Sequence, residues 1–134
     1  MKTINLSYTN GVSTTPLLGT TIGDKFDEIA HRFADNDALI VRHQNIRWTY
    51  AELAERVEQA AKAFIAIGVE PGDRVGMWSP NCAEWTITQF ATAKVGAILV
   101  NINPAYRLHE LEYALNQSEA KYLVTADSFK SSDY

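Results

Sequence analysis

The feature of this chain that most constrains its fold is an alternation of helical and strand-like patterns from Thr49 onward. Apolar residues at helical spacing alternate with short apolar runs of strand length. Such alternation is typical of a parallel sheet with helices packed against it. We therefore expect an α/β fold, with helices at residues 49–68, 81–96 and around 108–115, and with strands at 74–78, 97–100 and 121–125.

Capping signals support the expected helices. Thr49 followed by Glu52 forms a capping-box pattern, and Asn81 followed by Glu84 suggests a second helix start. Gly68 and Gly96 suit helix ends, because glycine enters the left-handed conformation at little cost. The expected buried stripe of the first of these helices comprises Leu53, Val57, Ala60, Ala61, Phe64 and Ile65. The continuous apolar run at 97–100 predicts a strand that is covered on both faces.

The segment before Thr49 predicts an arm, a helix and a hairpin. Residues 1–20 are polar and are expected to form an extended N-terminal arm. Thr21, with Asp24 three residues later, is expected to cap a helix that ends near residues 34–37. Two short apolar runs, 38–41 and 46–49, flank a polar turn and predict a β-hairpin.

The end of the chain suggests an incomplete domain. Asp127 follows the last expected strand, at a position typical of a helix cap, and residues 128–130 are expected to open a further helix. A doubly wound domain does not normally stop within the first turn of a helix. We expect truncation, and the alternative is a short frayed tail.

Composition excludes several classes of protein. The 134 residues are 46% hydrophobic, with a net charge of −4 and no basic stripe, so nucleic acid is not an expected partner. No apolar run approaches the ~20 residues that a membrane span requires. The N-terminus does not resemble a signal peptide. A single cysteine, Cys82, excludes an internal disulfide and fits a reducing compartment, so we expect a cytoplasmic protein.

Candidate chemistry is sparse. The glycines are dispersed, so they predict no phosphate-binding loop. His31, His43 and His109 lie in separate segments and are expected to be exposed, which predicts no metal site. Cys82 has no evident base beside it and is expected to be a small buried residue near a helix start. The tryptophans Trp48, Trp78 and Trp85 are expected to lie in the core more than in a binding pocket.

One loop is a candidate for binding. Residues 103–106, Asn-Pro-Ala-Tyr, follow the second strand of the expected parallel sheet and form either a ligand channel or a plain turn. Arg107 comes next and opens a helix, where it is either solvated or in reach of an anionic ligand. Tyr106 and Arg107 are therefore the only candidate pocket residues, and we expect no catalytic, cofactor-binding or metal-binding residue in this chain.

Four segments taken together resemble the adenylate-forming superfamily of AMP-binding enzymes. Residues 48–53, WTYAEL, match the first core motif of the family, and 93–104, AKVGAILVNINP, resemble the second. The turn 68–75, GVEPGDRV, and the element 81–85, NCAEW, match two further motifs in the family order and spacing. The variant with Asn-Pro-x-Tyr and a following Glu-Leu resembles acyl-CoA synthetases. The opening residues 16–23, PLLGTTIG, are similar to bacterial medium- and long-chain fatty-acid ligases.

The resemblance implies a two-step ligase reaction for a parent protein. A carboxylate attacks the α-phosphate of ATP, with Mg2+ bound, and coenzyme A then displaces AMP from the acyl-adenylate. The phosphate-binding loop, the ribose-binding acid and the catalytic lysine of the family all fall downstream of the matched region. The resemblance thus implies that residues 21–134 are an incomplete AMP-binding N-terminal domain, truncated before the phosphate-binding loop, and that this chain alone binds no cofactor and is inactive.

Two alternatives stay open. The parent could instead activate an aryl or amino acid, since most acid-pocket residues of the family lie downstream. Alternatively, the chain is a stand-alone, non-catalytic α/β binding module. The apolar stripes of its helices also make a homo-oligomer or self-association possible.

Overall fold

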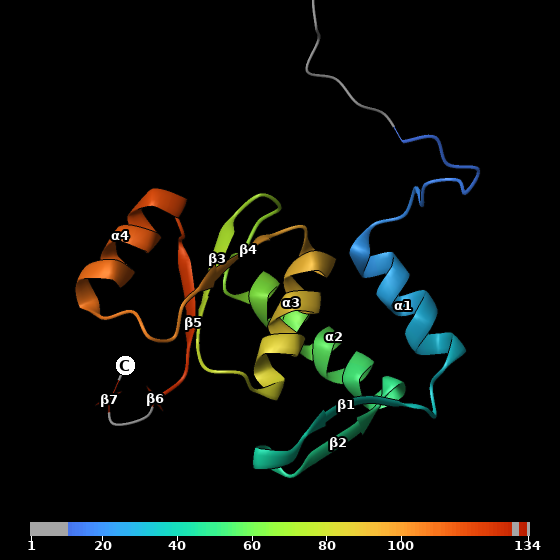
Figure 1. Cartoon of the computed structure of the whole chain (residues 1–134), viewed down its shortest axis with the longest axis horizontal. Coiled ribbons are helices and arrows are strands. Elements are labelled where there is room, and N and C mark those ends of the chain that lie inside the picture. The colour runs from blue at the N-terminus through green and yellow to red at the C-terminus, as the bar shows by residue number, and fades with distance from the viewer. Residues whose placement is uncertain (1–10, 130–131, 134) are drawn as a thin grey trace, which may run out of the picture.

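A three-stranded parallel sheet in the order β4-β3-β5 organises the computed structural model of the chain (Figure 1). The structure describes residues 11–129 and 132–133. The helices are α1 (Ile22–Arg32), the short η1 (Arg42–Gln44), α2 (Tyr50–Ala66), α3 (Ala83–Val95) and α4 (Leu108–Ser118). The strands are β1 (Asp37–Val41), β2 (Ile46–Thr49), β3 (Arg74–Trp78), β4 (Ile98–Ile102), β5 (Tyr122–Thr125), β6 (Ser128–Phe129) and β7 (Ser132–Asp133).

The helices lie on both sides of this sheet, as the alternating pattern predicts. Figure 1 shows α4 on one side and α3 on the other, with α2 and α1 beyond α3. The β1–β2 hairpin is antiparallel and packs against α2. The main core lies among α1, α2, α3 and β3, with Val57, Val75 and Ala91 fully buried at its centre. The α/β class and the N-terminal hairpin are confirmed.

The helix-end contacts that the sequence predicts form at several helices. The Thr21 hydroxyl accepts a hydrogen bond from the Asp24 amide at 3.1 Å. At α2, the Glu52 amide donates to the Thr49 hydroxyl, and the Thr49 amide donates to the Glu52 carboxylate at 2.8 Å. Gly96 ends α3 with φ of 77°, a left-handed conformation that favours glycine. These contacts satisfy backbone groups that each helix end leaves without a partner.

Three helices are joined by one lysine and one aromatic pair. The Lys94 ammonium on α3 lies 2.8 Å from the Asp27 carboxylate on α1 and 3.0 Å from Glu58 on α2. The rings of Phe26 on α1 and Phe90 on α3 stack with centroids 4.2 Å apart. Apolar packing therefore fixes the inner side of this helical layer, and ion pairs fix its rim.

The opposite face of the sheet allows close approach of α4 because the central strand carries a glycine. A Cβ at Gly76 would lie 3.1 Å from the Ile102 and Leu123 methyl groups and 3.4 Å from a Leu115 methyl. Leu115 of α4 thus packs directly over β3. No residue of α4 is buried, and Leu108 is 80% exposed, so α4 covers this face thinly.

Two predicted elements near helix ends are wrong. Asn81 does not cap α3; the N-cap residue is Cys82, and a side chain from η1 supplies the capping bond. Of the residues 128–130 that were expected to open a helix, 128–129 form β6, which pairs with β7 in an antiparallel arrangement, and residue 130 lies outside the described residues. In both places, contacts between segments decide the local structure, and the single-segment pattern does not contain them.

Burial also differs from two expectations. Ile65 is 62% exposed, although the sequence predicts it in the buried stripe. Successive residues of a helix are about 100° apart, so Ile65 lies outside the buried face that ends at Phe64. The second strand of the parallel sheet is not covered on both faces: β4 is an edge strand in the described part of the chain, and Ile98 is 50% exposed. The prediction of a core role holds most clearly for Trp78, which is buried, whereas Trp48 and Trp85 are half-buried.

Residues 11–20 form neither helix nor strand and are exposed, while the expected arm over residues 1–10 lies outside the described residues. Among the described helices, none has the length and apolar character to cross a bilayer.

Candidate functional site

The carboxyl ends of the three parallel strands meet at one edge of the sheet. Trp78, the last residue of β3, pairs in register with Ile102 at the end of β4 and with Thr125 at the end of β5. Ligands of open α/β sheets bind in crevices outside the carboxyl ends of the strands. This edge is therefore where the topology of the chain favours a site.

Trp78 ties the three strand ends together. Its indole Nε1 donates to the backbone carbonyl of Asn103 at 3.1 Å, beyond the end of β4. The carbonyl of Trp78 accepts a hydrogen bond from the Ala126 amide at 3.3 Å, beyond the end of β5. Trp78 is 7% exposed, so little of its surface can contact a ligand. Its role is to hold the strand ends together through these hydrogen bonds.

A cavity of about 330 Å3 opens between the ends of β3 and β5 and the start of α3. Its polar lining comes from the ends of the two strands, from the residues just beyond them and from the start of α3. The lining residues are Met77, Ser79, Cys82, Glu84, Val124, Thr125, Ala126 and Asp127.

The thiol of Cys82 lies beside the Ser79 hydroxyl, and it also interacts with the Glu84 carboxylate and helps to lower the pKa of that group. Its Sγ lies 3.4 Å from the Ser79 Oγ, and that hydroxyl also contacts the Pro80 carbonyl at 2.9 Å. None of the lining residues is a histidine. A nucleophile needs an adjacent base or a lowered pKa, so this pair does not form a catalytic dyad. Cys82 is half-buried at the start of α3, close to the expected place.

Glu84 stays ionised at this cavity. The Gln44 side-chain amide donates to its carboxylate at 2.9 Å and lowers the pKa of Glu84, and the Glu84 backbone amide acts in the same direction against the effect of burial. Asp127 adds a second carboxylate, and no lining residue is cationic. This arrangement disfavours a phosphate group at the cavity.

Tyr106 and Arg107, the predicted pocket residues, lie beyond the end of β4 and do not line this cavity. Tyr106 is 38% exposed, and Arg107 is exposed at the start of α4. The Arg107 backbone amide donates to the Glu110 carboxylate at 3.1 Å, and one guanidinium nitrogen contacts the Tyr106 carbonyl at 3.3 Å. In the described residues, no carboxylate lies within salt-bridge distance of the guanidinium, although its charge helps to lower the pKa of Glu110. Their role in a substrate or coenzyme A channel stays a prediction.

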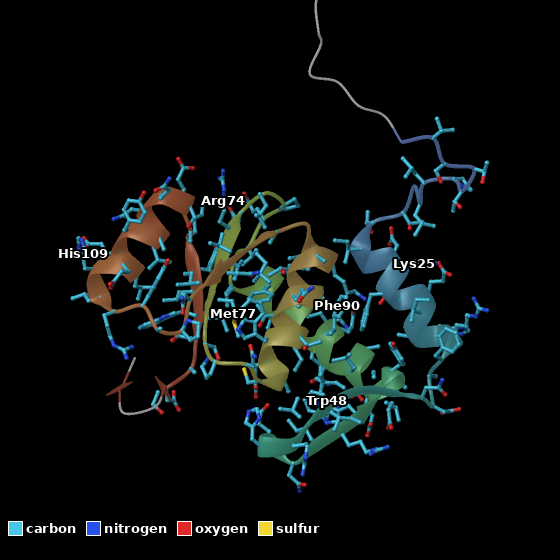
Figure 2. All side chains as sticks on the ribbon, viewed as in Figure 1. Lys25, Trp48, Arg74, Met77, Phe90 and His109 are labelled. Atoms are coloured by element: carbon cyan, nitrogen blue, oxygen red, sulfur yellow. The ribbon has the colours of Figure 1, made fainter. Side chains whose placement is uncertain are left out.

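The histidines do not enter the site. His31, His43 and His109 are all exposed, as predicted, and Figure 2 shows His109 on the outer side of α4. The described residues contain no group of three or more His, Cys, Asp or Glu side chains that could hold a metal ion.

The residues that line the cavity were not predicted as site residues, although the sequence carries a signal for some of them. Ser79 directly follows β3, and Asp127 lies two residues beyond the end of β5, so their positions alone mark them as candidates. Glu84 was assigned to a helix cap. Gln44 gives no signal in the sequence, because its partners lie on α3 and belong to a distant segment.

Comparisons with known proteins agree with the fold. A medium-chain acyl-CoA ligase of Mus musculus (ACSF2, mitochondrial) is 45% identical over 129 residues, which cover 96% of this chain and 21% of that protein. The Klebsiella oxytoca NpsA N-terminal subdomain in complex with anthranilyl-AMSN is 32% identical with a TM-score of 0.75, over 80% of this chain and 27% of that one. A Mycobacterium tuberculosis fatty acyl CoA synthetase is 28% identical with a TM-score of 0.76, over 78% of this chain and 21% of that one.

The chain spans about a fifth of the length of the curated relatives that it matches. The family model described as AMP-binding enzyme matches residues 26–133, nearly the whole chain. The chain belongs to the AMP-binding enzyme family.

Proposed function

We propose that this chain is the N-terminal portion of an AMP-forming acyl-CoA synthetase that activates a fatty acid, with a medium-chain acid as the first candidate. The observation that carries the proposal is the 45% identity, over 96% of this chain, to a protein named as a medium-chain acyl-CoA ligase. Relatives from several vertebrates bear the same name at 42–46% identity.

The proposed parent enzyme uses ATP, Mg2+ and coenzyme A. A carboxylate oxygen attacks the α-phosphorus of ATP and pyrophosphate leaves, which gives an acyl-adenylate. The coenzyme A thiol then attacks the acyl carbon, loses its proton and displaces AMP. The metal and cationic side chains offset the charge that develops on the phosphate.

In this proposal the chain supplies scaffold and no catalytic group. Thr49 and Glu52 of the first motif form the capping box of α2. Asp73 of the turn motif 68–75 accepts the Glu70 amide at 3.0 Å and contacts Lys121, so it holds the turn. Trp85 of the motif 81–85 donates from its indole to the Ser79 carbonyl at 3.2 Å. These three motifs therefore have a structural explanation that needs no ligand.

The proposed domain organisation follows from this division. Residues 1–20 are an N-terminal arm, and 21–134 are an incomplete AMP-binding domain whose phosphate-binding loop lies downstream. The acidic lining of the cavity at the strand ends supports a phosphate site elsewhere. Cytoplasmic location is part of the proposal and rests on the single cysteine; the Mus musculus relative is named as mitochondrial.

The test compares two proteins. We expect the full-length protein to catalyse acid-dependent exchange of pyrophosphate into ATP and to form acyl-CoA from octanoate. We expect the 134-residue chain to do neither. Exchange by the short chain would place catalytic groups within it and contradict the scaffold role. A full-length protein that is inactive with every acid would favour a non-catalytic α/β binding module.

An aryl or amino acid is the second candidate substrate. The resemblance to NpsA, solved with an anthranilyl ligand, favours including aryl acids in the test. A panel of octanoate, benzoate, anthranilate and phenylalanine separates the candidates by kcat/KM. Sedimentation of the same protein reports whether it is a homo-oligomer.

A further inference from the structure

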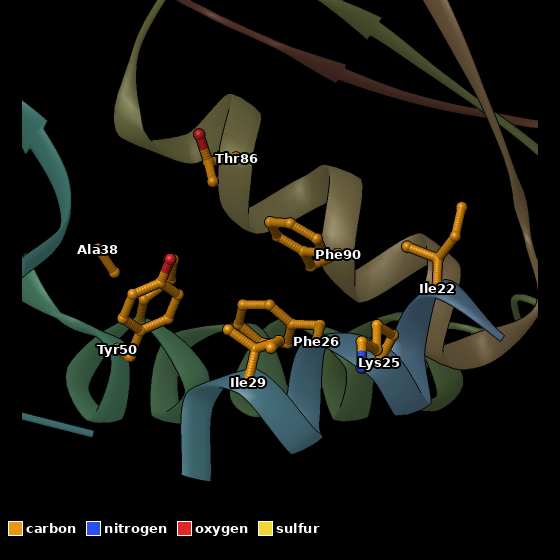
Figure 3. Close-up of a pocket in the computed structure, with 9 residues that line it drawn as sticks. Ile22, Lys25, Phe26, Ile29, Ala38, Tyr50, Thr86 and Phe90 are labelled. Atoms are coloured by element: carbon orange, nitrogen blue, oxygen red, sulfur yellow. The ribbon is translucent and has the colours of Figure 1, made fainter. Parts of the chain in front are cut away.

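A second cavity, of about 400 Å3, lies among α1, the start of α2, α3 and β1 (Figure 3). It shares no lining residue with the cavity at the strand ends. Its volume falls within the range of about 300–1,000 Å3 that is typical of small-molecule pockets. We refer to it as the α1–α3 pocket.

Aromatic rings form much of this pocket. Phe26 and Phe90 stack with their planes at 20° to each other, and Phe90 lies between the two ends of the pocket in Figure 3. Tyr50 supplies a third ring at one end. Aromatic rings favour further aromatic partners in offset or edge-to-face geometry, so the pocket suits a flat ring.

Two hydroxyl groups give the pocket a polar end. Tyr50 and Thr86 both line it, and Figure 3 places Tyr50 beside Ala38, at the end away from Ile22 and Lys25. Among the described residues, neither hydroxyl has a hydrogen-bond partner, and no buried side-chain nitrogen or oxygen lacks one. Both hydroxyls are therefore open to a ligand. A hydroxyl both donates and accepts, so this end suits a ligand that carries a hydroxyl of its own.

The charge at the opposite end is already neutralised. Lys25 is the only charged residue of the lining, and its ammonium lies 2.8 Å from both carboxylate oxygens of Glu28. An anionic ligand would have to compete with this carboxylate. The pocket thus favours an uncharged molecule.

We propose that the α1–α3 pocket binds an uncharged aromatic alcohol of one or two rings, with the ring against Phe90 and the hydroxyl at the end that Tyr50 and Thr86 line. The site goes beyond the proposed ligase reaction, because its residues lie on the helical layer and not at the carboxyl ends of the strands. Its failure therefore leaves the ligase proposal untouched.

The probe is 2-naphthol, titrated by calorimetry into the full-length protein. We expect one saturable site that binds naphthalene more weakly. Tyr50→Phe and Thr86→Val each remove a hydroxyl and keep the shape of the side chain. Each is expected to weaken 2-naphthol binding by about fivefold, which is the usual value of one neutral hydrogen bond. Tyr113→Phe, at an exposed tyrosine of α4, is the matched control and leaves binding unchanged.

The location is tested separately with 6-bromo-2-naphthol in crystals of the full-length protein. An anomalous bromine peak beside Phe90 supports the proposal, even if one variant folds poorly. The proposal is overturned if binding is not saturable, if the bromine lies only elsewhere, or if both variants bind 2-naphthol as the wild type does. It is equally overturned if other residues of the full-length protein fill the pocket.

Discussion

The side-chain amide oxygen of Gln44 accepts a hydrogen bond from the backbone amide of Ala83 at 2.7 Å, so a residue of η1 caps a helix that begins 39 positions later. Cys82, the N-cap residue itself, makes no side-chain capping bond. The nitrogen of the same Gln44 amide donates to Glu84 in the first turn. The hairpin segment and α3 are thereby joined at the edge of the candidate site.

Replacing Gln44 by alanine should therefore loosen the start of α3. Loss of an N-terminal capping bond costs about 1 kcal/mol of helix stability. We expect faster amide hydrogen exchange at Ala83 and Glu84 in Gln44→Ala, measured by NMR or mass spectrometry. Gln59→Ala, which removes an exposed glutamine of α2 that bonds only to Glu55, is the control. Equal exchange in the two variants would contradict the capping role.

Gly76→Ala tests the close approach of α4 to the sheet. The added Cβ would meet two methyl groups at 3.1 Å, so side chains on both neighbouring strands have to move. We expect a loss of about 1–3 kcal/mol in the free energy of unfolding, which is the usual cost of overpacking. Gly19→Ala is the control, because nothing lies within 4 Å of its added Cβ. A midpoint of thermal unfolding that is equal in both variants would disprove the contact.

The pair of Asp73 and Lys121 predicts a dependence of stability on pH. Lys121, and next the Glu70 amide, lower the pKa of Asp73 below its usual 3.8. Because the folded pKa is the lower one, the stabilisation is present above the unfolded pKa and is lost as pH falls through the folded pKa. The stability difference between wild type and Asp73→Asn should stay constant from about pH 7 to pH 5 and shrink towards about pH 2.

Lys121→Met removes the partner and should show the same trend in a series of urea titrations. A difference that does not change with pH would mean that the ion pair adds nothing to stability. The turn would then depend on the Glu70 amide bond alone.

Arg107 is tested in the full-length enzyme, and this prediction depends on the proposed function. If the guanidinium meets an anionic part of coenzyme A or of the acid, Arg107→Met should raise the KM of that substrate about two- to fivefold, the value of one exposed charge contact. The rate of adenylate formation at saturation should not change. Arg32→Met, at the exposed end of α1, is the control. If wild type and Arg107→Met have equal KM values for all substrates, the loop at 103–106 is a plain turn without a role in binding.

The sequence predicted the order of elements because their signals are local. The apolar period of Leu53, Val57 and Phe64 lies within α2. The caps at Thr21 and Thr49 each lie at the start of a single helix, α1 and α2. Gly96 likewise ends α3 through its own backbone conformation. Such features depend on residues that are a few positions apart, and one segment suffices to predict them.

What the sequence did not predict depends on distant contacts. Gln44 caps α3 across 39 residues, and the exposure of Ile98 follows from the strand order β4-β3-β5. The cavity at the strand ends requires β3 and β5 to be neighbours, although β4 lies between them in the sequence. The pocket that Tyr50 and Thr86 line forms only after α2 and α3 have packed.

The strand order also sets a schedule for synthesis of the chain. β3 is the first strand of the parallel sheet to be made, yet it occupies the central place and needs partners on both sides. Its second partner, β5, follows after about 48 residues, the separation of Asp73 and Lys121. At a translation rate of about 5–20 residues per second, β3 waits roughly 2–10 seconds for that partner. During this interval one edge of β3 has no strand to pair with, and a chaperone that covers this edge would protect the unfinished chain.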